Sequence, residues 1–536
     1  MLFGKTIAAL SLTTALVMPM IGAIPAAYAE TPPNMLVVAA EIDDLISLDP
    51  QEMFEFSGSD YANNVYQRLI AYDPKDFSKG YQPAIAESWE ISEDGKTFTF
   101  KIAEGLKFAS GNPVTASDVA FSLRRAVLLK KTPSFILTQF GFTEENASET
   151  LMAKDDGTFV LVTDKKYAPS FVLNCMTAAI ASIVDSKLVL ENEVDGDLGN
   201  GWLKTNSAGS GPYQLTSWKP NESLTISANP NFSGDAPAMN RVVVRHIAES
   251  ASQRLLLEKG DVDIVRNLSP EDVSGVLKSE DVKVMTDQRG RIMYISMNQQ
   301  DPTLSNPKVI EAIKYLIDYD GMVNSFLKGQ YMVHQAYLPL SYLGELKDKP
   351  YSFNIEKAKA LLAEAGLADG FEVEFIVRTA QERVEIAQSL QNTFGQAGIK
   401  ASIVQGTGKE TLGKYRARDF QIYVGAWGPD YPDPHTNADT FTSNPDNSFE
   451  AKLTGKLAWR NAWAADGYTE RTAAAAQETD TAMRAEMYVQ LQKDFQKEAP
   501  FAIMFQKTEQ NALRANVEGY SIGAAISAVY YGNVTK

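Results

Sequence analysis

The chain has 536 residues, a formal net charge of −17 and a single cysteine, Cys175. At roughly 150 residues per domain, this length predicts about three domains. The acidic balance argues against nucleic acid or anionic lipid as a partner, because both repel a negatively charged surface. One cysteine excludes an internal disulfide, which in an exported chain favours a bacterial periplasm and a large apolar core. Cys175 itself is expected to be a buried small hydrophobic residue.

The first 29 residues are typical of a secretory signal peptide. One basic residue, Lys5, precedes an apolar run over residues 7–24, and Ala27-Tyr28-Ala29 supplies small residues for cleavage. Polar residues interrupt the run, which argues against a membrane anchor. No cysteine lies near the cleavage point, so a lipid-modified start is not expected. The pattern predicts cleavage after Ala29 and a soluble, exported protein.

The next part of the chain begins with a predicted buried strand over residues 35–40, MLVVAA. An acidic loop that includes Glu41 and Asp43 follows this strand. Residues 61–70 are then predicted to form a helix that ends near a turn at Asp73-Pro74.

Two strong local signals follow the first helix. Asp94-Gly95 separates two alternating apolar runs, which predicts a hairpin. Thr115 and Asp118 form an [ST]-x-x-[DE] box before the apolar residues 119–128, which predicts a capped helix. From Gly209 onwards a predicted strand over 241–247 and a predicted helix over 251–259 alternate as in an α/β domain.

A third block begins with a predicted strand over residues 291–298. Its helices are marked by caps and by apolar faces. An apolar face predicts the first helix, and Asn354 as N-cap and Gly366 as stop mark the second. A last long helix is predicted before Pro500, where apolar residues recur every four positions in a stripe that is expected to face the core. The first face consists of Val309, Ile310, Ile313, Leu316 and Ile317, and the stripe of Met483, Met487, Leu491 and Phe495.

The sequence around residues 425–441, GAWGPDYPDPHTNADTF, is the strongest candidate for a binding loop. The alternation over residues 420–425 predicts a strand with one buried face that leads into it. The prolines predict that the stretch is not helical and that Trp427, Asp430 and Tyr431 are held in one geometry. A carboxylate beside aromatic rings suits an amine with an apolar body. The alternative is a turn whose acids only cap backbone amides.

Other chemistries have weaker support in the sequence. The three histidines show no metal-ligand spacing, and a lone histidine such as His435 is expected at the surface. A secreted hydrolase is the main alternative from another class, but there is no G-x-S-x-G or H-E-x-x-H motif. Asp430 and Asp433, three residues apart in a loop, do not establish acid and base roles. We therefore expect no enzyme activity, no metal and no cofactor.

The order of these segments resembles the large extracytoplasmic solute-binding proteins of ABC importers, the family of the dipeptide, oligopeptide and nickel receptors. The resemblance extends from about residue 39 to about residue 505. It is carried by PAIAESWEISEDGKTFTFKIAEGLKFASGNPVTASDVAFSLRR, GSGPYQLTSWKP, the GDVDI turn, PKVIEAIKYLIDYDGM and DFQIYVGAWGPDYPDP. It implies a two-lobed α/β periplasmic binding protein fold of type II, cluster C, with an extra subdomain inserted in the first lobe.

The resemblance also implies the boundaries of the lobes and a hinge that closes on the ligand. The signal peptide would be 1–29, and the second lobe 289–505. The first lobe would be 30–76, 206–288 and 506–536, with the inserted subdomain at 77–205. The two chain crossings near Gln288 and Phe505 would form the hinge.

The resemblance assigns candidate ligand contacts. In peptide receptors the aspartate that matches Asp430 holds the α-ammonium of the ligand. Ala426, Trp427 and Gly428 match positions whose backbone pairs with an extended peptide. Arg378 matches the arginine that takes the carboxylate in dipeptide receptors, with Arg383 as a competitor.

The remaining candidates and partners follow from the same resemblance. Glu41 and Asp43 lie where the first lobe would reach the ligand, and Tyr431 lies beside Asp430. The implied protein is a monomeric periplasmic receptor for di- or oligopeptides that delivers them to the membrane subunits of an ABC permease. An opine, glutathione, a sugar or chelated nickel remains an alternative ligand, because fold does not determine ligand.

Overall fold

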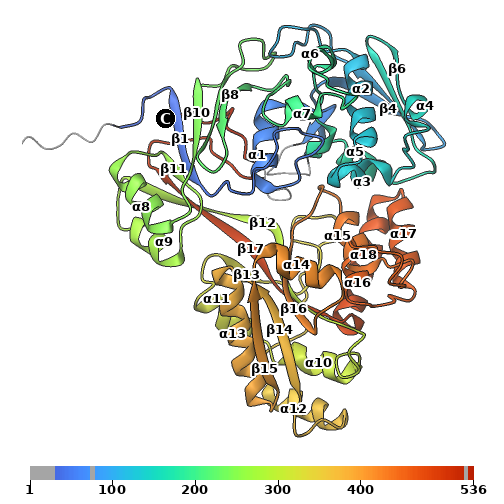
Figure 1. The fold of residues 1–536 in the computed structure, drawn as a ribbon, viewed down its shortest axis with the longest axis vertical. Coiled ribbons are helices and arrows are strands. Elements are labelled where there is room, and N and C mark those ends of the chain that lie inside the picture. Colours follow the sequence, from blue (N-terminus) through green and yellow to red (C-terminus); the bar gives the residue numbers. More distant parts are fainter. Residues whose placement is uncertain (1–29, 73–78, 524–528) are drawn as a thin grey trace, which may run out of the picture.

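The computed structural model describes residues 30–72, 79–523 and 529–536. The predicted signal peptide and the predicted turn at Asp73-Pro74 lie outside these ranges. The described chain forms two lobes, which are the upper and lower parts of the molecule in Figure 1. Two long strands, β12 (Val282–Met297) and β17 (Phe501–Arg514), run from one lobe into the other.

One mixed sheet extends through both lobes. Among the described residues it contains eleven strands. Their order is β15 (Lys400–Gly406), β14 (Glu372–Arg378), β16 (Ile422–Trp427), β12, β17, β11 (Ile264–Val265), β1 (Met35–Ala40), β10 (Arg241–His246), β9 (Ser223–Ala228) and β8 (Tyr213–Lys219), with β13 (Tyr331–Val333) paired to β17. β12 and β17 are antiparallel, and their register shifts between Gln288 and Ile292. Such an irregularity bends and twists a strand locally. β12 also begins nine residues earlier than the strand predicted over 291–298.

The first lobe is built around β1, which lies between two parallel neighbours, β10 and β11. Alternate β1 residues belong to two different apolar clusters, so both faces of this strand are covered. The predicted strands over 35–40 and 241–247 and the helix over 251–259 are confirmed. The elements of this lobe are β1 (Met35–Ala40), α1 (Phe56–Val65), β8 (Tyr213–Lys219), β9 (Ser223–Ala228), β10 (Arg241–His246), α8 (Ser250–Lys259), β11 (Ile264–Val265) and α9 (Pro270–Val276).

The helix predicted over residues 61–70 is shifted towards the N-terminus. Helix α1 ends at Val65, and Tyr66 has an extended backbone. The carbonyls of Arg68 and Leu69 accept hydrogen bonds from the backbone N–H groups of Ile85 and Ala86. The prediction was wrong here because pairing with a distant segment replaces the last helical turns. Arg68 therefore lies on an extended connection between α1 and β2 (Ile70–Tyr72).

The inserted subdomain lies between β1 and β8 in the chain and has its own four-stranded antiparallel sheet, β4-β5-β7-β6. The predicted hairpin at Asp94-Gly95 and the capping box of Thr115 and Asp118 are confirmed, and Cys175 is buried. β2 (Ile70–Tyr72) precedes the subdomain in the chain and pairs with its first strand, β3 (Tyr81–Pro83). The further elements of the subdomain are β4 (Ala86–Ile91), β5 (Thr97–Ile102), α2 (Ala116–Leu128), α3 (Phe135–Thr138), α4 (Ala147–Thr150), β6 (Leu151–Asp155), β7 (Thr158–Val162), α5 (Pro169–Cys175), α6 (Ser186–Glu191) and α7 (Asn200–Leu203), with short 3-10 turns at Thr132–Ser134 and Ala179–Ala181.

The second lobe carries helices on both faces of its part of the large sheet (Figure 1). The helix predicted from Val309 is confirmed up to Tyr315, and Leu316 and Ile317 follow its end but are buried with the rest of the apolar face. Asn354 and Gly366 begin and end the next predicted helix. The further elements are α10 (Pro307–Tyr315), α11 (Tyr319–Asn324), β13 (Tyr331–Val333), α12 (Ile355–Glu364), β14 (Glu372–Arg378), α13 (Gln381–Gln396), β15 (Lys400–Gly406), α14 (Gly408–Arg416), β16 (Ile422–Trp427), α15 (His435–Thr442), α16 (Leu457–Arg460), α17 (Tyr468–Gln477) and α18 (Thr481–Glu498).

Two predictions around the binding loop are wrong. The strand before the loop, β16, is buried on both faces, because it lies between β14 and β12 with a separate apolar cluster on each side. The stretch 425–441 was predicted to contain no helix, yet α15 begins at His435. Asp433 accepts a hydrogen bond from the backbone N–H of His435, which satisfies one of the free donors at the helix start.

The predicted core stripe of the last long helix is displaced by one residue. Met483 is 59% exposed, and the buried face of α18 begins at Arg484 and continues through Tyr488, Leu491 and Phe495. An arginine takes the first core position because it is paired with the buried Asp433. Apolar spacing alone therefore selected the wrong first member of this face.

Candidate functional site

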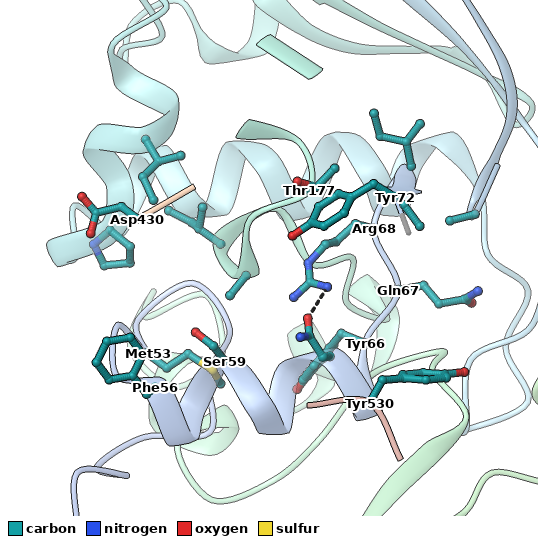
Figure 2. A pocket seen from close by; sticks show the side chains of 18 of the residues that line it. Met53, Phe56, Ser59, Tyr66, Gln67, Arg68, Tyr72, Thr177, Asp430 and Tyr530 are labelled. Atoms are coloured by element: carbon teal, nitrogen blue, oxygen red, sulfur yellow. Dashed lines mark hydrogen bonds between the residues drawn. The ribbon is translucent and has the colours of Figure 1, made fainter. Parts of the chain in front are cut away.

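A cavity of about 520 Å³ lies between the two lobes (Figure 2). The first lobe contributes α1 and the segment after it, the inserted subdomain contributes Ile136 and Thr177, and the second lobe contributes the start of the loop after β16. This volume is in the range of small-molecule sites. Its lining residues include Phe56, Ser59, Asn63, Tyr66, Arg68, Tyr72, Gly428, Pro429, Asp430 and Tyr530.

Asp430 is placed at this cavity by the proline-containing loop. The loop leaves β16 after Trp427, and the backbone N–H of Asp430 donates to Thr436 Oγ1 over 3.1 Å. No described residue forms an ion pair with its carboxylate. Burial raises the pKa of Asp430 from 3.8 to about 7, although a hydrogen bond with Thr436 acts in the opposite direction. A cation next to this carboxylate would offset the cost of its burial.

Asp433, three residues later, has a different environment. Its side chain is fully buried and accepts two hydrogen bonds from the Arg484 guanidinium, at 2.6 and 2.9 Å. Asn174 of α5 donates to it over 3.1 Å. Burial alone would raise the pKa of Asp433, but the charge and hydrogen bonds of Arg484, together with the hydrogen bonds from His435 and Asn174, outweigh burial and hold this pKa below its usual value. Asp433 thus links the second lobe to the inserted subdomain. It also accepts a hydrogen bond from a backbone N–H of its own loop, so the alternative of an acid that caps backbone amides applies to Asp433.

The two aromatic candidates of the loop lie outside the cavity lining. Tyr431 is 2% exposed and packs against Phe171 of α5, with ring centroids 5.9 Å apart. Its hydroxyl donates to Gln139 Oε1 over 3.4 Å, so it contacts the core of the inserted subdomain. Trp427 packs against an apolar cluster of the second lobe, and its indole N–H has no hydrogen-bond partner among the described residues.

The backbone of the loop start does reach the cavity. Gly428 lines it, and a Cβ atom at this position would lie 3.0 Å from Cζ of Phe56 on α1. A glycine therefore permits the close approach of the two lobes at this point. Ala426, two residues earlier, is partly buried beside the second-lobe core and is not a lining residue.

The other predicted contacts are not brought to Asp430. Glu41 and Asp43 are exposed after β1, and Arg378 is exposed at the end of β14. The pKa of Glu41 is raised, mainly by burial and by Asp43, whereas Arg378 partly lowers it, so Glu41 and Arg378 interact electrostatically. None of these three residues lines the cavity. Arg383 is 6% exposed on α13, and its Nε atom has no hydrogen-bond partner among the described residues.

The expectation of a surface position for His435 is wrong. The residue is buried, and its ring centroid lies 4.7 Å from that of Phe171. Burial lowers its pKa to about 4, so the imidazole is neutral at pH 7. Within the described ranges, no group of three or more His, Cys, Asp or Glu side chains is arranged to hold a metal ion. In the same ranges, no helix is both long and apolar enough to cross a bilayer.

The first-lobe residues of the cavity were missed by the sequence analysis. Phe56, Asn63 and Arg68 carry no motif, and the helix predicted over residues 61–70 contains two of them, Asn63 and Arg68, without assigning them a role. Only the end of α1 at Val65 and the extended connection after it turn Arg68 towards the interlobe space. No local signal in the sequence marks this change.

Comparison with known proteins gives a consistent result. Residues 80–449 match the model for bacterial extracellular solute-binding proteins, family 5 Middle. The chain is 28% identical over 513 residues to a probable D,D-dipeptide-binding periplasmic protein of Escherichia coli (strain K12). The aligned region covers 94% of this chain and 95% of the relative.

Solved structures show the same fold. The dipeptide binding protein from Pseudoalteromonas sp. SM9913 in complex with Met-Leu superposes with a TM-score of 0.79 at 21% identity, over 94% of this chain and 100% of that one. NikZ from Campylobacter jejuni in complex with Ni(L-His) gives 0.76 at 20% identity, over 94% and 100%. The expected two-lobed α/β fold is confirmed, and the chain belongs to the bacterial extracellular solute-binding proteins of family 5.

Proposed function

We propose that this protein captures short peptides in the cavity between its lobes and that Asp430 binds their α-ammonium group. The observation that carries the proposal is a carboxylate that lines the interlobe cavity without an ion pair to any described residue. A ligand amine would provide the missing counter-charge through charge-assisted hydrogen bonds. Relatives named for dipeptides support this ligand class.

The strand before Asp430 supports an extended ligand. The pairing of β16 with β12 continues to Trp427, whereas its pairing with β14 ends at Val424. The β14 side of Ala426 and Trp427 is therefore left without a strand partner among the described residues. An extended peptide can add to such an edge by main-chain hydrogen bonds, which would involve Ala426, Trp427 and Gly428 through their backbones.

The proposed mechanism is closure of the two lobes on the ligand. The hinge would be the crossing of β12 and β17 near Gln288 and Phe505, where the strand register is irregular. We assign 30–76, 206–288 and 506–536 to the first lobe, 77–205 to its inserted subdomain and 289–505 to the second. The loaded receptor would deliver its ligand to the membrane subunits of an ABC permease, as a cofactor-free monomer without enzyme activity.

The proposal includes export. A signal peptide cleaved after Ala29 would release a soluble periplasmic protein that begins at Glu30. N-terminal sequencing of periplasmic material tests this, and an apolar segment retained at the N-terminus would contradict it.

The ligand is tested by purifying the protein from its native host and identifying the bound small molecule by mass spectrometry. A di- or tripeptide is expected. An opine, a sugar or a metal chelate without a free α-amine would overturn the proposed role of Asp430.

A further inference from the structure

The charged side chains of the cavity are unevenly placed. Among the described lining residues, Asp430 and Glu55 are acidic and Arg68 is the single basic residue. Figure 2 shows Asp430 at the left of the view and Arg68 well separated from it near the centre, below Tyr72 and Thr177. The cavity therefore has an acidic part and a basic part, which suits a ligand with opposite charges at its two ends.

Arg68 is held in place by neutral acceptors. Its Nε donates to the carbonyl of Ala178 over 3.1 Å, and its Nη1 donates to Asn63 Oδ1 over 2.7 Å. No ion pair between Arg68 and a carboxylate occurs among the described residues. Burial lowers its pKa from 12.5 to about 10, so the group stays charged at pH 7. The two bonds fix the orientation of the guanidinium and use two of its five N–H donors.

An arginine with these neighbours is suited to a carboxylate. The guanidinium presents paired donors that match the two oxygens of a carboxylate. The two groups that accept hydrogen bonds from Arg68, on Asn63 and Ala178, carry no charge. A carboxylate on the ligand would therefore supply the counter-charge that Arg68 lacks among the described residues. Arg378, the arginine implied by family resemblance, is exposed and lies outside this cavity.

We propose that Arg68 binds the free carboxylate of the ligand, so that the cavity selects short zwitterionic peptides with the amine at Asp430 and the carboxylate at Arg68. This inference rests on the proposed function of the cavity. It moves the carboxylate contact from Arg378 on the second lobe to the segment after α1 on the first. Each lobe then binds one end of the ligand, and the ligand itself bridges the closed form.

The test compares the dipeptide Met-Leu with its C-terminal amide, by isothermal titration calorimetry of protein freed of bound ligand. For the wild-type protein, amidation is expected to weaken binding by about 30-fold or more, because it leaves the buried guanidinium without its partner. Arg68→Gln is expected to bind both forms weakly and equally. Arg378→Gln, the matched control, is expected to keep the preference for the free acid.

A second variant guards against loss of structure in Arg68→Gln. Asn63→Asp retains Arg68 and its contact with residue 63, because Asn63 Oδ1 already accepts a hydrogen bond from Nη1. The substitution replaces a neutral amide beside the guanidinium by a carboxylate. This variant is expected to keep its melting temperature and to lose the preference for the free acid. The inference is overturned if Arg68→Gln or Asn63→Asp retains that preference, or if Arg378→Gln loses it.

The N-acetylated dipeptide separates this inference from the proposed function. If acetylation weakens binding to the wild-type protein but amidation does not, Asp430 retains its role and the assignment of Arg68 is wrong. If no di- or tripeptide purifies with the protein and the wild-type protein does not bind Met-Leu, the proposed function fails, and the assignment of Arg68 fails with it.

Discussion

Substitution of Asp430 by asparagine should change stability and affinity in opposite directions. The change keeps the shape of the side chain and removes its charge. In the ligand-free protein that charge is costly, because burial raises the pKa from 3.8 to about 7. At 1.36 kcal/mol for each tenfold change in an ionisation constant, the cost of keeping this carboxylate ionised at pH 8 is about 4 kcal/mol.

The direction in which pH changes the free energy of unfolding follows from proton linkage. Between pH 3.8 and about 7 the folded protein binds a proton at Asp430 that the unfolded chain has released. The free energy of unfolding therefore falls as pH rises through this window and stays low above it. Asp430→Asn should raise the free energy of unfolding of the ligand-free protein by up to about 4 kcal/mol at pH 8 and by about 2 kcal/mol at pH 5.

The affinity of Asp430→Asn for peptide should fall, although its stability rises. A ligand ammonium would be left buried without its counter-charge, which costs roughly 2 to 5 kcal/mol, or about 30-fold to several-thousand-fold in affinity. Denaturant unfolding of ligand-free protein at pH 8 and pH 5, with calorimetric titration at pH 8, measures both effects. A variant that is less stable than the wild type at pH 8 and binds peptide with unchanged affinity would refute the reasoning, because that result describes a purely structural turn residue.

Three further predictions concern the framework of the site. Asp433→Asn should lower the free energy of unfolding by about 3 to 5 kcal/mol, because it leaves the buried Arg484 without its partner. At temperatures below the melting point of the variant, its affinity for peptide should change only a few-fold. A large loss of affinity without loss of stability would contradict this prediction. Thr115→Ala should destabilise the protein by about 1 kcal/mol in denaturant unfolding through loss of the α2 capping box, and no change would show that the cap is dispensable. A bound peptide should reduce the radius of gyration in small-angle scattering and, at a hundredfold excess over Kd, stabilise the protein by about 2.7 kcal/mol, whereas an unchanged radius would contradict hinge closure.

Local sequence signals predicted local structure well. The hairpin at Asp94-Gly95, the cap at Thr115 and the stop at Gly366 are confirmed, because each depends on residues within one turn. The errors occur where distant segments decide. The end of α1 is set by pairing with residues 85–86, and the buried face of α18 is set by the contact of Arg484 with Asp433.

The candidate site shows the same limit. Asp430 and Asp433 are both acids in one proline-containing loop, and the sequence offers no means of telling their environments apart. In the fold, Arg484 from α18 and Asn174 from α5 surround Asp433, while Asp430 has no ion-pair partner among the described residues. Arg68 could not be found because its position depends on an early helix end that no local residue signals.

The central claim is that Asp430 holds the amine of a peptide in the interlobe cavity. A double-mutant cycle of wild type and Asp430→Asn against a free and an N-acetylated dipeptide tests it most directly. Acetylation should weaken binding to the wild-type protein by about 30-fold or more and have little effect on the variant, since the pair is already broken there. An equal loss of affinity in both proteins would mean that the ligand amine is not bound by Asp430.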